Sequence, residues 1–118
     1  MKNTILIAII VLVVSGFESK KPTIEGKWNT GVENTIIRIY KTHTGWEGRT
    51  VSTDREGVKT NQLVLRGITE KDDQWEGEFY IPKLGVWLDA TLVPAEDEMK
   101  VTAHTWLMSK TKEWKRIQ

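Results

Sequence analysis

The sequence feature that most constrains the fold is a series of short runs in which apolar and polar residues alternate. From Ile24 onward no long segment repeats its apolar residues with helical periodicity, and turn-forming residues separate the runs. Such alternation is typical of strands with one buried face. The pattern predicts strands at residues 24–30, 35–40, 46–53, 62–69, 75–81, 86–93, 99–107 and 111–117. We therefore expect an all-β chain.

The connections between these runs are short and rich in Gly, Pro, Asn and Asp. They include residues 31–34, 43–45, 71–74, 83–85 and 94–97. Short connections join sequential antiparallel strands, and eight such strands must close or stack to hide an apolar face and its edges. The expected fold is a small eight-stranded antiparallel up-and-down barrel. A two-sheet sandwich is the alternative.

The first residues have the three-part plan of a secretory signal peptide. Lys2 precedes an apolar run over residues 5–14, and the small residues Ser15 and Gly16 follow. An uncleaved membrane anchor is the alternative. It is less favoured because the run is shorter than the roughly 20 residues that a spanning helix needs. We expect cleavage near Gly16 and an exported protein, periplasmic or secreted, with no stable membrane span in the mature chain. The predicted organisation is a signal peptide (1–16), a linker (17–23) and a barrel domain (24–118).

Charge and cysteine content exclude several classes of function. The chain has 17 basic and 16 acidic residues, and removal of residues 1–16 takes away only Lys2. A balanced domain has no broad attraction for nucleic acid or anionic lipid. Because the chain has no cysteine, disulfides, thiol catalysis and cysteine metal sites are excluded. We expect a monomer without a nucleic-acid partner.

Alternation also predicts which side chains point into the barrel, because the side of each strand without charges should be interior. The candidate ligand-contacting residues of the interior are Ile37, Ile39, Trp46, Thr50, Trp75, Phe79, Leu88, Val101 and Thr105. Eight strands enclose a space that side chains either fill or leave open for one small ligand. Two interpretations stay open: an aromatic-rich core, or an apolar pocket with Thr50 and Thr105 as polar points.

Two tryptophans, Trp87 and Trp106, fall on the outer side of their expected strands. Exposed tryptophans either cover a barrel end or form an apolar patch for a partner. In the second case we expect an envelope protein to bind through them.

A local repeat, Trp46-Glu47-Gly48 and Trp75-Glu76-Gly77, opens two strands after polar turns. Glycine inside a strand allows a bend or a close approach of another chain segment. The repeat is therefore interpreted as two matching bends of the barrel.

The two ends of the predicted barrel resemble those of lipocalin-like barrels, the calycins. Gly26-Lys27-Trp28 on the first strand and Trp114-Lys115-Arg116 on the last match the Gly-x-Trp and late Arg of that group. The resemblance implies that Trp28 plugs one end with Arg116 against its ring, in a closing set formed by Gly26, Trp28, Trp114 and Arg116. A cation over an indole face is a favourable contact.

A longer pattern resembles a family of exported bacterial proteins called domain of unknown function 2147. It consists of Gly26-x-Trp28, residues 37–40 (Ile-Arg-Ile-Tyr), Trp75-x-Gly77-x-Phe79-Tyr80-x-Pro82-x-x-Gly85, and Trp114-x-Arg116. The resemblance covers nearly the whole mature chain and implies a lipocalin-like barrel without an established activity. This chain has Ile81 where the family usually has an acidic residue or Asn, and Leu88 where it often has Tyr. Ala103 and Ser109 replace frequent glycines.

No constellation of catalytic or metal-binding residues is visible. His43 and His104 are the two histidines, too few for a zinc site without cysteines. No nucleophile elbow, phosphate loop or dinucleotide fingerprint is present, so we expect no cofactor and no metal. The favoured function is binding of a small apolar or amphiphilic ligand inside the barrel. A non-catalytic envelope interaction or structural module is the alternative, and an enzyme ranks last.

Overall fold

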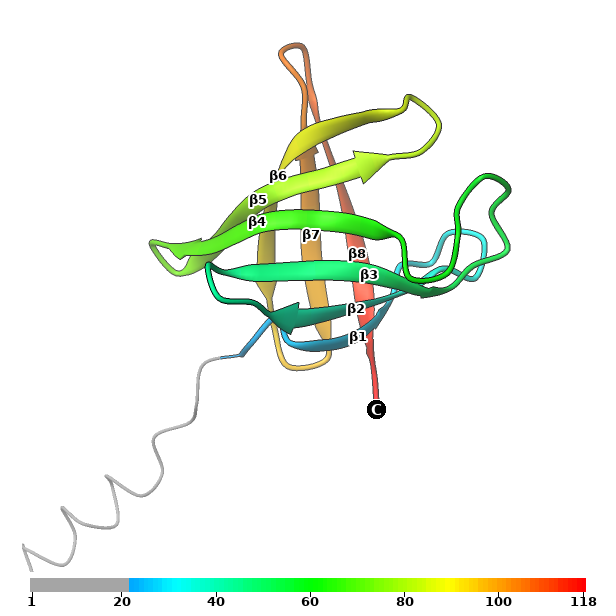
Figure 1. The fold of residues 1–118 in the computed structure, drawn as a ribbon. Helices are drawn as coiled ribbons and strands as arrows, with labels where there is room; N and C mark the ends of the chain where they lie inside the picture. The colour runs from blue at the N-terminus through cyan, green and yellow to red at the C-terminus, as the bar shows by residue number, and fades with distance from the viewer. Residues whose placement is uncertain (1–21) are drawn as a thin grey trace, which may run out of the picture.

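The computed structural model describes residues 22–118, so the predicted signal peptide and most of the predicted linker lie outside the described residues. The strands are β1 (Gly26–Asn29), β2 (Ile36–Lys41), β3 (Trp46–Ser52), β4 (Leu63–Lys71), β5 (Gln74–Ile81), β6 (Val86–Pro94), β7 (Glu98–His104) and β8 (Ser109–Ile117). They form one closed antiparallel barrel in chain order (Figure 1). Because β1 pairs with β8, the expected up-and-down barrel is confirmed and the sandwich is excluded. Within residues 22–118 no helix could cross a membrane.

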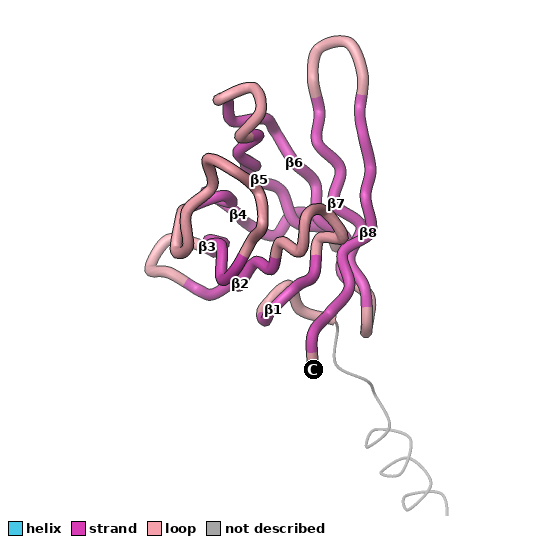
Figure 2. The backbone as a smooth tube through the Cα atoms, turned by 90° about the vertical axis from the view of Figure 1, so that its right-hand side faces the viewer, coloured by secondary structure: helices cyan, strands magenta, loops and turns pink. Residues whose placement is uncertain are grey.

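The sheet twists strongly, so that β2, β3 and β4 cross the view of Figure 1 while β7 and β8 run at a steep angle to them. Antiparallel order places alternate connections at opposite ends of the barrel. We call closed end the segment before β1 together with residues 42–45, 72–73 and 95–97. We call open end the connections at residues 30–35, 53–62, 82–85 and 105–108. The β7–β8 hairpin projects furthest at the open end (Figure 2).

The core is one hydrophobic cluster, and it includes Ile37, Ile39 and Val101, which alternation assigned to the interior. Its buried members are Ile24, Trp28, Ile37, Ile39, Val64, Leu65, Ile68, Ala90, Leu92, Met99, Val101 and Trp114. Trp46, Trp75 and Phe79 pack against this cluster as half-buried residues, so their inward placement is confirmed. Burial of these aromatic rings supplies a large part of the apolar area that a domain without disulfides needs.

Glycines let the strands of the barrel approach one another. Gly67 has φ +60 in the middle of β4, where the register against β5 shifts, and this bulge lets both Leu65 and Ile68 face the core. A Cβ on Gly48 would lie 2.9 Å from Leu65 Cδ1, and one on Gly77 would lie 2.8 Å from Ile68 Cγ1. The repeated glycines therefore mark two places where β4 packs too closely for a side chain.

One hairpin turn of the barrel was predictable from its turn-forming residues, and another was not. Asp72 and Asp73 both have positive φ between β4 and β5, the conformation that matches the twist of a two-residue hairpin. The predicted strand over 99–107 is too long, because β7 ends at His104. The Thr105 hydroxyl accepts a hydrogen bond from the N–H of Met108 (3.0 Å) and donates one to its carbonyl (2.9 Å). This local bonding makes a turn without Gly, Pro, Asn or Asp.

Candidate functional site

The closed end is built around Trp28, which is fully buried. Its indole N–H donates a hydrogen bond to the carbonyl of Ile24 (2.9 Å), so the polar edge of the ring is satisfied. The Arg116 guanidinium carbon lies 4.2 Å from the centroid of the indole. The contact that the calycin-like ends implied is therefore present in this chain.

Arg116 also ties together two segments of the backbone that are remote in sequence, the one before β1 and the β6–β7 connection. Its Nε donates to the carbonyl of Glu96 (3.0 Å), and its two terminal nitrogens donate to the carbonyls of Glu25 and Thr23 (2.7 Å each). Gly26 has φ +128, and a Cβ there would lie 3.0 Å from an Arg116 nitrogen. The absence of a side chain at Gly26 is thus part of the closure.

Trp46 and Trp75 complete the aromatic packing at this end. They meet edge to face, with ring centroids 5.7 Å apart. The two tryptophans were candidates for contact with a ligand, but each opens its strand directly after a closed-end turn. They therefore act as packing between β3 and β5.

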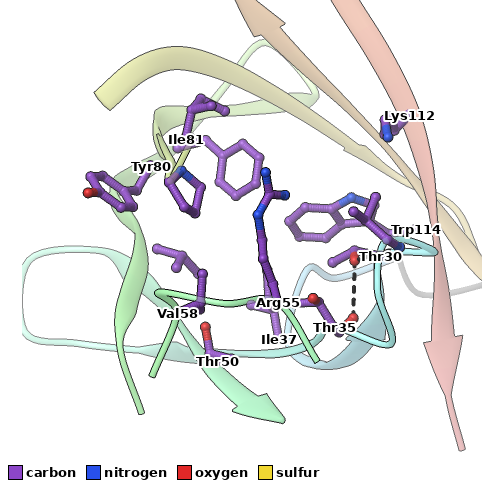
Figure 3. A pocket seen from close by; sticks show the side chains of 14 residues that line it. Thr30, Thr35, Ile37, Thr50, Arg55, Val58, Tyr80, Ile81, Lys112 and Trp114 are labelled. Atoms are coloured by element: carbon purple, nitrogen blue, oxygen red, sulfur yellow. Dashed lines mark hydrogen bonds between the residues drawn. The ribbon is translucent and has the colours of Figure 1, made fainter. Parts of the chain in front are cut away.

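The open end contains a cavity of about 190 Å³ (Figure 3). Its lining residues are Thr30, Val32, Thr35, Ile37, Thr50, Arg55, Val58, Val64, Phe79, Tyr80, Ile81, Pro82, Lys112 and Trp114. The lining is mainly apolar and comes from the inner faces of β2, β3, β4 and β5, from the three connections between β1 and β2, β3 and β4, and β5 and β6, and from β8. β8 contributes because β1 pairs only with residues 115–117, which leaves the earlier part of β8 without a partner on that side.

Thr50 gives this cavity one unsatisfied polar group. The residue is 2% exposed, and its hydroxyl has no hydrogen-bond partner among the described residues. A buried hydroxyl without a partner costs about 1–3 kcal/mol. Thr30, which also lines the cavity, differs because its hydroxyl donates to the carbonyl of Thr35 (3.1 Å). Thr50 is thus a lining residue with a buried polar group that ordinary core packing would satisfy.

Two cationic side chains reach the same cavity. Figure 3 shows Arg55 extending upward through the middle of the cavity beside Trp114, with Lys112 above. Among residues 22–118 neither side chain forms an ion pair. The acidic residues Glu33, Asp54 and Glu56 line an adjoining outer groove, which Arg55 and Lys83 also line. The cavity itself is lined by cations and no acid.

Phe79 and Trp114 form the aromatic wall of the cavity. Their rings meet edge to face with centroids 5.6 Å apart. Trp114 was expected in the closing set with Trp28; it is buried in the same core cluster as Trp28 and also lines the open-end cavity. Trp114 and Arg116 are two residues apart and therefore lie on the same face of β8. Trp114 lines the cavity, whereas Arg116 contacts Trp28 at the closed end.

The structure divides the predicted interior residues into groups. Ile37, Thr50 and Phe79 line the cavity, whereas Ile39 and Val101 belong to the core. Leu88 is half-buried opposite Phe79 on the neighbouring strand.

Thr105 is wrongly placed by the prediction, because it is exposed in the β7–β8 turn and its hydroxyl is used by that turn. Arg55, Val58 and Lys112 were missed. The first two lie in a loop without periodicity, and the third is a charged residue on a strand whose inner face was not assigned from the sequence.

The two outer tryptophans have different surroundings. Trp87 is half-buried. The ring centroids of Trp87 and Tyr80 are 5.3 Å apart, and the Arg66 guanidinium carbon lies 3.9 Å from the Trp87 ring centroid. Trp106 is 91% exposed, and it lies in the β7–β8 turn instead of on a strand. Only the second presents a free indole to a partner.

The histidines show no arrangement typical of catalysis. His104 Nε2 shares a hydrogen bond with the Thr91 hydroxyl (2.9 Å), and Nδ1 shares one with the Ser109 hydroxyl (2.8 Å). These bonds join β6, β7 and β8 at the base of the projecting hairpin. Within residues 22–118 no group of three or more His, Asp and Glu residues could hold a metal ion.

Comparison of the chain with protein-family models, with curated proteins and with solved structures finds no match. The resemblance to domain of unknown function 2147 therefore stays a prediction from the motifs alone.

Proposed function

We propose that the barrel binds a small anionic amphiphile, with the apolar part of the ligand in the open-end cavity. The observation that carries the proposal is an apolar cavity with an unpartnered buried hydroxyl at Thr50 and unpaired cations at Arg55 and Lys112. Ligand sites are typically concave and apolar, with a few polar groups that fix orientation. This combination distinguishes the open end from ordinary core packing.

The volume of the cavity limits the size of what enters it. About 190 Å³ corresponds to roughly six times the 30 Å³ that a water molecule occupies in the liquid. This is below the roughly 300–1,000 Å³ of sites for drug-sized ligands. The expected occupant is a short acyl chain, or the end of a longer chain whose remainder extends out of the mouth.

Each polar group has a distinct expected part in recognition. Arg55 and Lys112 would pair with a carboxylate or phosphate at the mouth, because neither has an acidic partner of its own. The Thr50 hydroxyl would bond an oxygen carried along the apolar chain. A hydroxylated acyl carboxylate therefore fits the site better than a plain hydrocarbon or alcohol.

Calorimetric titration with octanoate, 1-octanol and a hydroxyoctanoate tests this proposal. We expect the acids to bind more tightly than the alcohol, and the hydroxylated acid to bind best. Thr50→Val should remove the advantage of the hydroxyl group while leaving octanoate binding intact. No binding by any of the three probes would overturn the proposal.

A cavity-filling variant separates a binding cavity from surface adsorption. Val58→Phe places a larger side chain in the lining, and Val93→Phe places the same side chain at an exposed position on β6 outside it. We expect the first variant to stay folded and lose ligand binding, and the second to bind as the unmodified chain does. Equal binding by both variants would show that ligand does not enter the cavity.

A non-catalytic interaction module is the second candidate function, and the exposure of Trp106 favours it. The two functions use different surfaces and are compatible. Export of the protein is a further proposal, which rests on the sequence of residues 1–16 alone. N-terminal sequencing of protein recovered from the periplasm or medium tests it, with a new terminus near Phe17 as the expected result.

A further inference from the structure

The exposed apolar side chains of the barrel are gathered at the open end. Six large apolar residues are exposed within residues 22–118. All except Val93 lie at or next to the open-end turns of two hairpins, whereas Val93 lies near the other end of β6. The β5–β6 hairpin carries Leu84 (64% exposed) and Val86 (41%). The β7–β8 hairpin carries Trp106 (91%), Leu107 (71%) and Met108 (66%) consecutively at its turn. We call these five residues the apolar tips.

The apolar tips are projections and form no groove. The ladder between β6 and β7 ends at the pair Asp89 and His104, so the residues beyond that pair on each hairpin lack a partner strand there. Figures 1 and 2 show the β7–β8 hairpin extending past the rest of the barrel. A convex apolar projection fits a soft surface that it can enter, because an exposed indole and its apolar neighbours gain most when they leave water.

Charge is distributed unevenly between the hairpins and the rest of the chain. Residues 82–88 and 104–112 contain Lys83, Lys110 and Lys112 and no acidic residue, although the whole chain has nearly equal numbers of acids and bases. The acids of the open end, Glu33 and Glu56 among them, lie on the other two connections. The apolar tips are therefore flanked by positive charge on their own hairpins. Basic residues beside an apolar projection are complementary to anionic lipid headgroups.

We propose that the apolar tips insert into the surface of an anionic lipid membrane. Trp106 would lie at headgroup depth, where indole rings are favoured, with Leu107, Met108 and Leu84 at the edge of the acyl region. Lys83 and Lys110 would contact lipid phosphates. The mouth of the cavity, at the same end of the barrel, would then lie near the lipid. This inference goes beyond ligand binding, because it concerns a surface outside the cavity.

A fluorophore placed at the tip reads this insertion directly. The chain has no cysteine, so Leu107→Cys gives a unique site for a polarity-sensitive dye in the full chain. Val93→Cys is the matched control, because Val93 is also an exposed apolar residue but lies on β6 away from the tips. We expect vesicles of phosphatidylcholine with phosphatidylglycerol to shift the dye at position 107 to shorter wavelength, and not the dye at position 93. Because the dye reports its own surroundings, an attachment made by residues 1–21 alone would move neither.

Two further measurements complete the test. Lys83→Gln with Lys110→Gln should weaken tip insertion by about 25-fold, since each lysine near an anionic surface contributes roughly fivefold in affinity. Added salt should have the same effect in the unmodified chain. No shift at position 107, or equal shifts at both positions, would overturn the proposal. If the apolar tips do not bind vesicles but are required to bind a protein, the membrane proposal is overturned in favour of a protein partner.

The two proposals can fail separately. Octanoate titration is done without vesicles, and tip insertion is read without a soluble ligand. A chain that binds octanoate but leaves the dye at position 107 unchanged keeps the cavity proposal and loses the membrane proposal. The reverse result does the opposite.

Discussion

The two ends of this barrel use the same kinds of residue for different purposes. At the closed end the Arg116 guanidinium lies over the Trp28 ring. Every nitrogen of the Arg116 side chain also donates a hydrogen bond to a backbone carbonyl. At the open end a buried hydroxyl at Thr50 and a cation at Arg55 have no partner in the described chain. Stable packing leaves few unsatisfied polar groups, whereas a binding site keeps some of them free for a ligand. This difference is the basis for the proposal that ligand binds at the open end.

The contrast between the two ends predicts that a substitution at the centre of the closed end causes the largest loss of stability. Trp28→Ala should lower the free energy of unfolding by about 3–5 kcal/mol, because it removes a fully buried ring and leaves a cavity. That is a large share of the roughly 5–15 kcal/mol of a small domain. Urea unfolding followed by circular dichroism measures the change. A loss below about 1 kcal/mol would show that this end is not the main source of stability.

The second effect concerns the Arg116 side chain, which is only partly buried. Arg116→Ala should cost about 1.5–3 kcal/mol, the range for hydrogen bonds made by a charged group. Because its guanidinium lies on the Trp28 ring, the losses from Arg116→Ala and Trp28→Ala should not add in the double variant. Strict additivity in the unfolding measurements would mean that the cation and the ring contribute independently.

At the open end a substitution should raise stability. Thr50→Val replaces the unpartnered hydroxyl with a methyl group and should increase the free energy of unfolding by about 1 kcal/mol. Thr30→Val is the matched control, because Thr30 lines the same cavity but its hydroxyl is bonded to Thr35. The control should lower stability. If both variants are destabilised equally, the Thr50 hydroxyl is satisfied in solution and the contrast between the two ends weakens.

Strand alternation made the fold predictable, because a buried face with period two leaves its mark at each position. It placed Ile37, Thr50 and Phe79 inside the barrel, where they line the cavity. The closing contact of Trp28 with Arg116 came from a resemblance of motifs at the two ends of the chain and not from periodicity.

The remaining parts of the site depend on loops and on local bonding, which alternation does not encode. Arg55 and Val58 reach the cavity from a connection without periodicity. Lys112 lies on β8 opposite Val101 of β7 but beyond the part of β8 that pairs with β1, where a charge is tolerated near the mouth. The β7–β8 turn at Thr105 forms through a side-chain hydroxyl, so the sequence rules for turns did not mark it.

Overall composition does not report how charge is distributed over the surface. A nearly neutral chain indicates no general affinity for anionic surfaces, yet the bases and acids of the open end lie on different connections. Lys83 and Lys110 flank the apolar tips, whereas Glu33 and Glu56 lie on the other two loops. Electrostatic attraction to a membrane depends on the charges within about one Debye length of the contact, and a sum over the chain does not report them.

The smallest predicted effect returns to an ion pair near the closed end. Lys115 donates a hydrogen bond to Glu98 (3.1 Å), which with a contact from Glu113 holds the pKa of the Glu98 carboxyl below its ordinary value of 4.5. A lowered pKa in the folded state stabilises the fold above the ordinary value, and this contribution is lost as pH falls through the lowered pKa. Glu98→Gln should therefore slightly reduce the acid dependence of thermal unfolding below about pH 4.5. At neutral pH we expect only a small change, because the pair is exposed to solvent.

The open end offers the matching control for this measurement. Arg55 has no ion pair in the described chain, so Arg55→Gln should leave the acid limb of the unfolding profile unchanged. The two variants thus separate a charge that is paired within the fold from one that has no ion pair in the described chain. If Arg55→Gln shifted the acid limb as much as Glu98→Gln, Arg55 would have a carboxylate partner in solution. The cation at the mouth would then no longer be free for a bound anion.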